Sequence, residues 1–322
     1  MLAALLWLRL FALNGFTESA GQQPQQESTA SRCTISVNVD EVLLPITVLD
    51  RKGRFVPGLQ EKNFRIFEDR VPQKIQYFEH QDLPVTVGLV IDSSGSMGPK
   101  LPEVKAAALA FALSSNPKDE MFGVNFNEKV SFSLHGDTAF VDNADQLKEA
   151  FSGIRAIGKT ALYDAIAVAL EHLQKGHWEK KALIVVSDGG DNASHHTWDQ
   201  VARMAEESKT VIYTIGLFDE NDRDQNPQVL KNLAKMTGGA AFFPETLSDV
   251  VGTCEQIAKE IRNQYNLGYI STNRTMDGKY RKIRVTAIAP KRGTLAVRTR
   301  AGYLAGSENV KEPATRETVC VQ

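Results

Sequence analysis

The sequence predicts an α/β fold: a doubly wound, mostly parallel sheet inserted into a small β-sandwich that the two ends of the chain build together. Three observations lead there. Apolar runs such as Val85 to Ile91 and Ala182 to Ser187 alternate with helical patterns in the middle of the chain, as in sheets covered on both faces. Before and after this region the apolar period is two. The strands at each end are too few to bury a core alone, so we expect them to pair.

Composition agrees with an ordinary globular protein. The length of 322 residues suggests about two domains. Lys and Arg number 37 against 39 Asp and Glu, a formal charge of −2, which argues against nucleic-acid binding because that function needs a basic surface. Three cysteines are too few for a disulfide scaffold.

The beginning of the chain resembles an export signal. Met1 to Leu8 is apolar, but Arg9 interrupts the run, which is too short for a transmembrane helix. We therefore expect a signal peptide over residues 1–20, a polar linker over 21–32, and a secreted or periplasmic protein. A disordered tail or a misassigned start codon is the alternative.

The two flanks are predicted to form the sandwich, with residues 33–83 as its first part and 263–305 as its second. The expected strands, set by period-two alternation and turn residues, cover 36–50, 64–66, 75–78, 265–271, 280–288 and 294–300. Residues 306–322 form a polar tail.

Residues 84–262 are predicted to be the α/β domain. Besides the two apolar runs, strands are expected at 121–126, 130–134, 210–217 and 240–243, and helices at 102–114, 145–151, 161–173, 198–207, 228–236 and from 247 onward. Thr246 and Asp249 resemble a capping box for the last helix. Cys254 lies on the apolar stripe of that helix, so we expect a buried thiol.

A set of oxygen-bearing side chains follows the first buried strand. Asp92, Ser94 and Ser96 stand at alternate positions of one turn, and Gly95 lets the backbone fold tightly between the serines. Ligands of open α/β sheets bind at this edge. One carboxylate with two hydroxyls suits Mg²⁺ or Mn²⁺ better than zinc.

Two further loops add oxygen atoms at the same edge. Thr160 precedes a predicted helix, where it would either cap the helix or ligate a metal, and Asp188 follows the second apolar strand as Asp92 follows the first. Two carboxylates beside one cation would leave room for water and for one ligand oxygen.

This pattern, Asp92-x-Ser94-x-Ser96 with Thr160 and Asp188-Gly189, resembles the metal-ion-dependent adhesion site of von Willebrand factor type A domains. The resemblance covers about residues 84–262. It implies that the serines and the threonine bind the metal directly or through water, and that the aspartates often act through water. It further implies a protein ligand that donates an Asp or Glu carboxylate to the metal.

The flanks carry a second resemblance. Residues 48–49, 53–59, 64–69, 284–285 and 301–303 are similar to exported type A-related proteins of Acidobacteria. That family implies the fold and the metal site but names no partner.

Several neighbours of the motif are candidates for supporting the ligands or lining the rim of the site. They are Ser93, Gly95, Met97, Gly189, Asp191, His195 and His196. Met97 fits helix packing as well as a rim position. The two histidines fit a solvated helix start better than a transition-metal site.

The sequence thus predicts an exported, adhesion-type protein-binding module with Mg²⁺ or Mn²⁺ and no catalytic residue. One alternative is an assembly scaffold whose metal site is structural or a relic. A metal-dependent hydrolase is a weaker alternative, because it would need His195 or His196 as general base. Cys33 and Cys320 could form a disulfide if the two ends of the chain meet.

Overall fold

The computed structural model describes residues 41–134, 138–219, 224–289 and 293–306. The predicted signal peptide, linker and most of the polar tail lie outside the described residues, as do Cys33 and Cys320. None of the described helices is long and apolar enough to cross a membrane.

The middle of the chain forms a six-stranded sheet in the order β10-β9-β8-β5-β6-β7. The first five of these strands are mutually parallel, and β7 pairs antiparallel with β6 at the edge. The bounds are β5 Thr86–Asp92, β6 Glu120–Phe126, β7 Val130–Phe132, β8 Lys181–Ser187, β9 Val211–Gly216 and β10 Ala241–Phe242.

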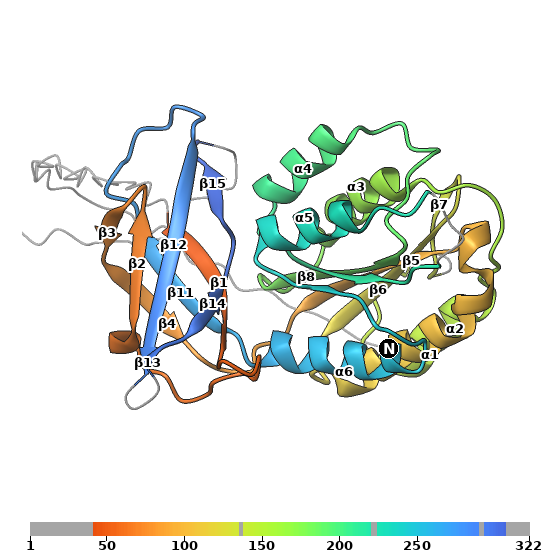
Figure 1. Ribbon diagram of the computed structural model, residues 1–322, viewed down its shortest axis with the longest axis horizontal. Coiled ribbons are helices and arrows are strands. Elements are labelled where there is room, and N and C mark those ends of the chain that lie inside the picture. Colours follow the sequence, from red (N-terminus) through yellow and green to blue (C-terminus); the bar gives the residue numbers. More distant parts are fainter. Residues whose placement is uncertain (1–40, 135–137, 220–223, 290–292, 307–322) are drawn as a thin grey trace, which may run out of the picture. The chain divides into compact units, whose positions relative to one another are not determined.

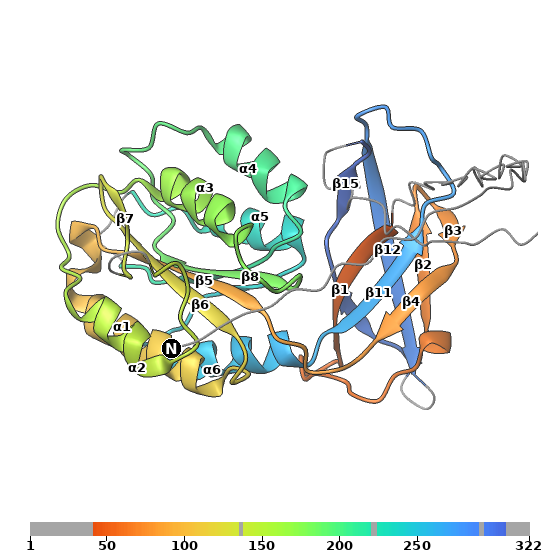
Figure 2. The same cartoon turned by 180° about the vertical axis from the view of Figure 1, so that it is seen from behind.

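Helices cover both faces of this sheet (Figures 1 and 2). One core includes α1, α2 and α6, and a second core on the opposite face includes α3, α4 and α5. In β5, Leu89 and Ile91 belong to the first core and Val90 to the second. Burial on both faces explains the unbroken apolar run. The helices are α1 Leu101–Ser114, α2 Ala144–Ser152, α3 Leu162–Leu173, α4 Trp198–Glu207, α5 Pro227–Thr237 and α6 Asp249–Arg262, with short 3₁₀ helices at Glu61–Asn63 and Gly95–Lys100.

The flanks form two antiparallel sheets with a common core. One has the order β14-β1-β11-β4, and the other has the order β13-β12-β2-β3 with β15 also paired to β12. Their bounds are β1 Glu41–Leu49, β2 Phe64–Glu68, β3 Val71–Gln73, β4 Ile75–Glu79, β11 Tyr265–Ile270, β12 Tyr280–Ala289, β13 Gly293–Thr294, β14 Ala296–Arg298 and β15 Gly302–Leu304.

Each of these sheets combines both ends of the chain. β1 pairs with β11, and β2 pairs with β12. Leu44 and Ile46 of one sheet share a core with Phe64 and Val285 of the other. The predicted fold class, a doubly wound sheet inserted into a sandwich of the two flanks, is therefore confirmed.

The predicted strand over 294–300 is wrong in one respect. The structure divides it into β13, which pairs with β12, and β14, which pairs with β1 in the other sheet. Between them, Leu295 is buried in the common core. The chain crosses from one sheet to the other at this point, and a period-two pattern cannot reveal such a crossing.

The last helix begins two residues later than predicted, at Asp249. The predicted cap is wrong, because Ser248 is the residue before the helix and, in the part of the chain that the structure describes, the Thr246 hydroxyl accepts no N–H of the first turn. The contact between Thr246 and Asp249 is present, because the Asp249 carboxylate accepts hydrogen bonds from the Thr246 N–H and hydroxyl at 3.2 and 2.7 Å. Cys254 is buried as expected, and burial raises the pKa of its thiol to about 12.

Gly239 supplies a test of the packing around β9. A Cβ atom at Gly239 would overlap the backbone carbonyl of Ile212, whereas Gly252, inside α6, has open space around it. We expect Gly239→Ala to lower the free energy of unfolding by about 1–3 kcal/mol. Gly252→Ala should raise it by about 0.5–1 kcal/mol, because alanine loses less entropy in a helix. Urea unfolding measures both, and equal effects would contradict this packing.

Candidate metal centre

The first turn of the site begins at the end of β5. Asp92 is the last residue of this strand and has no exposed surface. Its Oδ1 accepts the backbone N–H of Ser94 at 2.8 Å. Ser94 is extended, and the 3₁₀ helix Gly95–Lys100 starts directly after it. The turn therefore leads from the strand into α1 while the carboxylate stays at the strand end.

Asp188 reaches the same point from the neighbouring strand. β5 and β8 are parallel, with Ile91 opposite Val186, so their carboxyl ends lie side by side. The Ser96 hydroxyl donates to Asp188 Oδ2 at 2.7 Å and lies 3.2 Å from Ser94 Oγ. Ser96 is thus within hydrogen-bond distance of two other predicted ligands, Ser94 and Asp188.

The Ser187 hydroxyl connects the Asp92 carboxylate to the loop that carries Asp188. This hydroxyl donates to Asp92 Oδ2 at 2.6 Å and accepts the N–H of Gly189 at 3.0 Å. Ser187 is a functional residue that sequence reasoning missed, although it precedes Asp188 directly. Its inward orientation follows from its place in β8, and the pattern of residue types carries no signal for it.

Thr160 belongs to a loop that lies against the first turn. Ile157 N–H donates to Ser93 O at 2.9 Å, and Gly95 N–H donates to Gly158 O at 3.0 Å. Thr160 is 6% exposed. Within the described residues, its hydroxyl forms no hydrogen bond with the other four predicted ligands. The structure therefore brings the Thr160 loop to the site through its backbone.

The site buries negative charge without a basic partner. Asp92 and Asp188 are 0% and 2% exposed, and among the described residues no Lys, Arg or His forms an ion pair with either carboxylate. Burial raises the pKa of Asp92 to about 6, against the hydrogen bonds from Ser187 and Ser94. Buried charges in proteins are normally paired or bound to metal, so this arrangement favours a cation.

The oxygen atoms fit a hard divalent cation. The separations of 3.2 Å between the two serine hydroxyls and 2.7 Å between Ser96 and Asp188 lie near the roughly 3 Å between adjacent oxygens of an octahedral Mg²⁺ shell. The described residues contain no group of three or more His, Cys, Asp or Glu side chains that could hold a metal. The predicted set contains two carboxylates, and its other members are hydroxyls.

The remaining candidates divide into backbone supports and packing residues. Ser93 donates its hydroxyl to Phe126 O at 2.9 Å and so fixes the turn to β6. Gly95 bonds to the Thr160 loop, and Gly189 adopts a φ of 81° beside the Asn226 carbonyl. Met97 is fully buried in a core. Its side chain therefore packs α1 and is not part of a rim.

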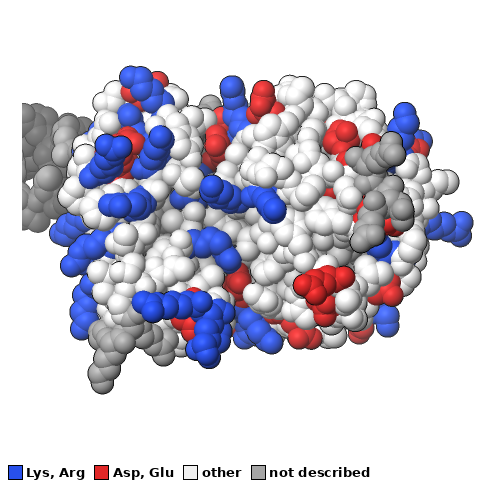
Figure 3. Space-filling view, in the orientation of Figure 1, with Lys and Arg blue, Asp and Glu red and all other residues white. Residues whose placement is uncertain are grey.

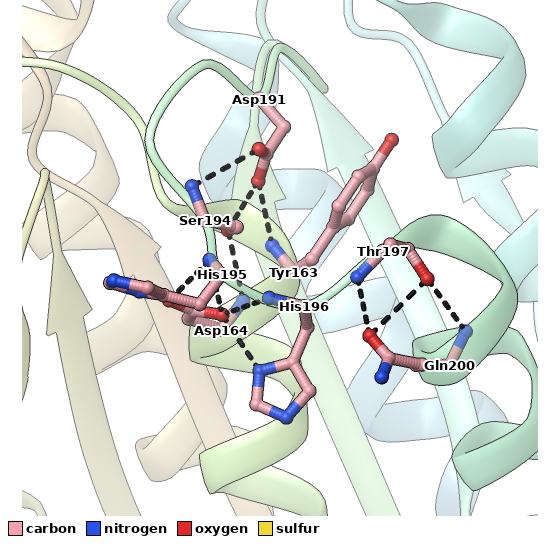
Figure 4. Close-up of polar contacts among 8 residues, drawn as sticks. All are labelled: Tyr163, Asp164, Asp191, Ser194, His195, His196, Thr197 and Gln200. Carbon is pink, nitrogen blue, oxygen red and sulfur yellow. Dashed lines mark hydrogen bonds and ion pairs between the residues drawn. The ribbon is translucent and has the colours of Figure 1, made fainter.

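Asp191 and the two histidines lie around the start of α3 (Figure 4). Asp191 Oδ2 accepts the N–H of Tyr163 at 2.9 Å. The Nδ1 atoms of His195 and His196 contact the carboxylate of Asp164, at 3.1 and 2.7 Å. Asp164 was not singled out in the sequence, because an aspartate in the first turn of a helix is ordinary.

Comparison with known proteins agrees with the fold. A family model for the von Willebrand factor type A domain matches residues 86–257. Over 185 residues the chain is 25% identical to the uncharacterized protein sll0103 of Synechocystis sp., covering 56% of this chain and 42% of that protein. Over 201 residues it is 23% identical to inter-alpha-trypsin inhibitor heavy chain H4 of Homo sapiens, covering 59% and 22%. The chain thus spans less than half the length of either curated relative.

A solved structure supports the fold. The von Willebrand factor type A protein from Catenulispora acidiphila superposes with a TM-score of 0.50 at 13% identity, over 84% of this chain and 75% of that chain.

Ser187 provides a test of the buried carboxylate. We expect Ser187→Ala to lower the free energy of unfolding by about 1–3 kcal/mol, because it removes the buried hydroxyl that donates to Asp92 Oδ2. Ser152→Ala removes an exposed hydroxyl that bonds within α2 and should change stability by less than about 0.5 kcal/mol. Both are measured by urea unfolding at pH 7 without metal. If the two variants are equally stable, the Ser187–Asp92 contact contributes nothing.

Proposed function

This chain belongs to the von Willebrand factor type A domain family, and we propose that it is an exported, divalent-cation-dependent module that binds an acidic group of a protein partner. The observation that carries this proposal is the pair of buried carboxylates, Asp92 and Asp188, whose described hydrogen-bond donors are all uncharged. Export is proposed from the pattern of residues 1–20 alone.

The chain's own residues would divide the work of holding Mg²⁺ or Mn²⁺. Ser94, Ser96 and Asp188 form the contiguous oxygen group, and Thr160 would add a hydroxyl from the opposing loop. Asp92 would support the cation from outside this oxygen group, with its carboxylate held in place by the Ser187 hydroxyl. The bound cation supplies the positive charge that attracts the partner's carboxylate.

Charge is unevenly distributed over the surface. On the face shown in Figure 3, Lys and Arg side chains gather over the sandwich, while both signs are interspersed over the α/β domain. A bound cation would add positive charge at the strand ends, near the exposed Lys159 that precedes Thr160.

The contacts of the histidines favour binding over hydrolysis. A general base for a metal-activated water must lie within hydrogen-bond reach of that water. The described ring contacts of His195 and His196 are made to Asp164, which is not among the predicted ligands. We therefore propose no catalytic residue.

The metal centre is tested by titrating Mn²⁺ and Mg²⁺ into metal-stripped protein in a calorimeter. We expect saturable binding at one site and its loss in Asp92→Ala, which removes a buried carboxylate from the site. Glu171→Ala removes an exposed carboxylate of α3 and should leave the dissociation constant unchanged. Binding that survives in Asp92→Ala would place the cation elsewhere.

The open metal position is tested by water proton relaxation with Mn²⁺ bound. Mg²⁺-type sites keep several waters, so we expect the α-methylamide of N-acetylglutamate, whose one carboxylate is on the side chain, to displace water and lower the relaxation rate. The α-methylamide of N-acetylglutamine has nearly the same shape and no carboxylate, and it should leave the rate unchanged. If neither compound changes the relaxation rate of a protein that binds Mn²⁺, the structural-site alternative is favoured over ligand recognition.

A further inference from the structure

We propose that Asp164 is a positioning residue of the metal centre. It joins the loop that carries Asp188 to the Thr160 loop and to the helix that follows that loop. Asp164 lies in the first turn of α3, and within the described part of the chain it forms no hydrogen bond or ion pair with the predicted ligands. It acts through the segment 191–197, which it holds against the start of the helix. The inference rests on the proposed function, since it concerns the same cation site.

The Asp164 carboxylate collects N–H donors from two successive residues (Figure 4). The backbone N–H groups of His195 and His196 donate to it at 3.0 and 2.8 Å. The two ring Nδ1 atoms lie at 3.1 and 2.7 Å. An ionised carboxylate can only accept hydrogen bonds, so each Nδ1 carries the hydrogen. One side chain thereby fixes the backbone and both rings of the histidine pair.

Side chains of the segment 191–197 in turn accept hydrogen bonds from the first turn of the helix. Asp191 Oδ2 accepts the N–H of Tyr163 at 2.9 Å, and Ser194 Oγ accepts the N–H of Asp164 at 3.1 Å. These two N–H groups belong to the first turn of α3, which has no partners for them within the helix. Ser194 in turn donates its hydroxyl to Asp191 at 2.5 Å. Segment and helix therefore satisfy each other's polar groups.

The same segment holds Thr160. Thr160 N–H donates to Asn192 Oδ1 at 2.9 Å, and the N–H groups of Asn192 and Ala193 donate to Thr160 O at 2.9 and 3.0 Å. Asn192 lies four residues after Asp188 and three before His195. A segment anchored by Asp164 thus fixes the backbone of one predicted ligand and continues directly from another.

The environment of Asp164 keeps it ionised for this task. Burial alone would raise its pKa, but the backbone N–H groups and rings of both histidines outweigh burial and hold the pKa below its usual range. His195 has a side chain that is 94% exposed, against 40% for His196. The His196 ring therefore makes the better protected of the two ring contacts.

Asp164→Asn tests the inference against a matched control. The amide cannot accept all four N–H groups, and its own NH₂ would face donors. We expect the dissociation constant for Mn²⁺, measured by calorimetry on the full chain, to rise at least tenfold, as for other residues that orient metal ligands. The control is Asp119→Asn. Asp119 is likewise an aspartate that accepts backbone N–H groups, from Val85 and Asn116, but it is more fully buried and lies at the amino ends of the strands. The Asp119→Asn variant should have a dissociation constant for Mn²⁺ within twofold of that of the unmodified chain.

A second pair of variants separates positioning from general stability. The side-chain amide of Asn can place an N–H near the position of a histidine Nδ1–H, so His196→Asn should keep the affinity for Mn²⁺ within about threefold. His196→Ala loses the donor and should bind several times more weakly than His196→Asn. Equal dissociation constants for Asp164→Asn, Asp119→Asn and the unmodified chain would overturn the inference.

Hydrogen exchange on metal-free protein tests the positioning even if the chain binds no cation. Asp164→Asn should speed exchange at the backbone amides of Thr160 and Asn192 at least tenfold, while Asp119→Asn leaves them unchanged. Faster exchange without cation binding by the unmodified chain would contradict the proposed function and leave the link between the loops intact. Unchanged exchange in Asp164→Asn would overturn the link itself.

Discussion

The parallel pairing of β5 with β8 is the constraint on which the site depends. Its register brings Ile91 opposite Val186, and each strand delivers one aspartate to the same edge. Because adjacent strands lie about 4.8 Å apart, two carboxylates at their ends lie close together. Uncharged donors partly satisfy them, and the serines of the first turn close the space between them. The oxygen group is therefore a consequence of sheet geometry.

The loops complete what the strands begin. Backbone hydrogen bonds dock residues 157–160 on the first turn, and Asn192 fastens Thr160 to the loop after β8. Two of the three loops are thus tied to each other by reciprocal bonds between side chains and backbone. Such ties limit how far a ligand can move when the cation leaves, which favours a site whose shape exists before the metal arrives.

Much of this arrangement could be predicted from residue types and spacing. The runs before Asp92 and Asp188 indicated buried parallel strands, and strands of that kind must end at one edge. The contributions of Ser187 and Asp164 could not be predicted, because they depend on which atoms meet across chain separations of 95 and 31 residues. For Met97, the sequence suggested a position that the structure does not support. Its place next to Ser96 suggested a rim, but the 3₁₀ turn directs its side chain into the core.

The sandwich poses the same problem of long-range pairing. Alternation predicted its strands, and the shortage of strands at each end predicted that the two ends pair. Only the structure shows Leu295 at the crossing between sheets. Leu295 stays buried at the crossing, so the hydrophobic pattern of the sequence continues through it.

Cation binding and stability must be linked in a site of this kind. Burial is the main cause of the raised pKa of Asp92, and repulsion from the Asp188 carboxylate adds to it. A divalent cation would offset that repulsion in the folded chain alone, because the unfolded chain does not bring the two residues together. A ligand that binds only the folded state stabilises it by about 2.7 kcal/mol at a hundred times its dissociation constant. The arrangement that makes the site attractive to a metal therefore also makes the metal-free domain less stable than its packing alone would allow.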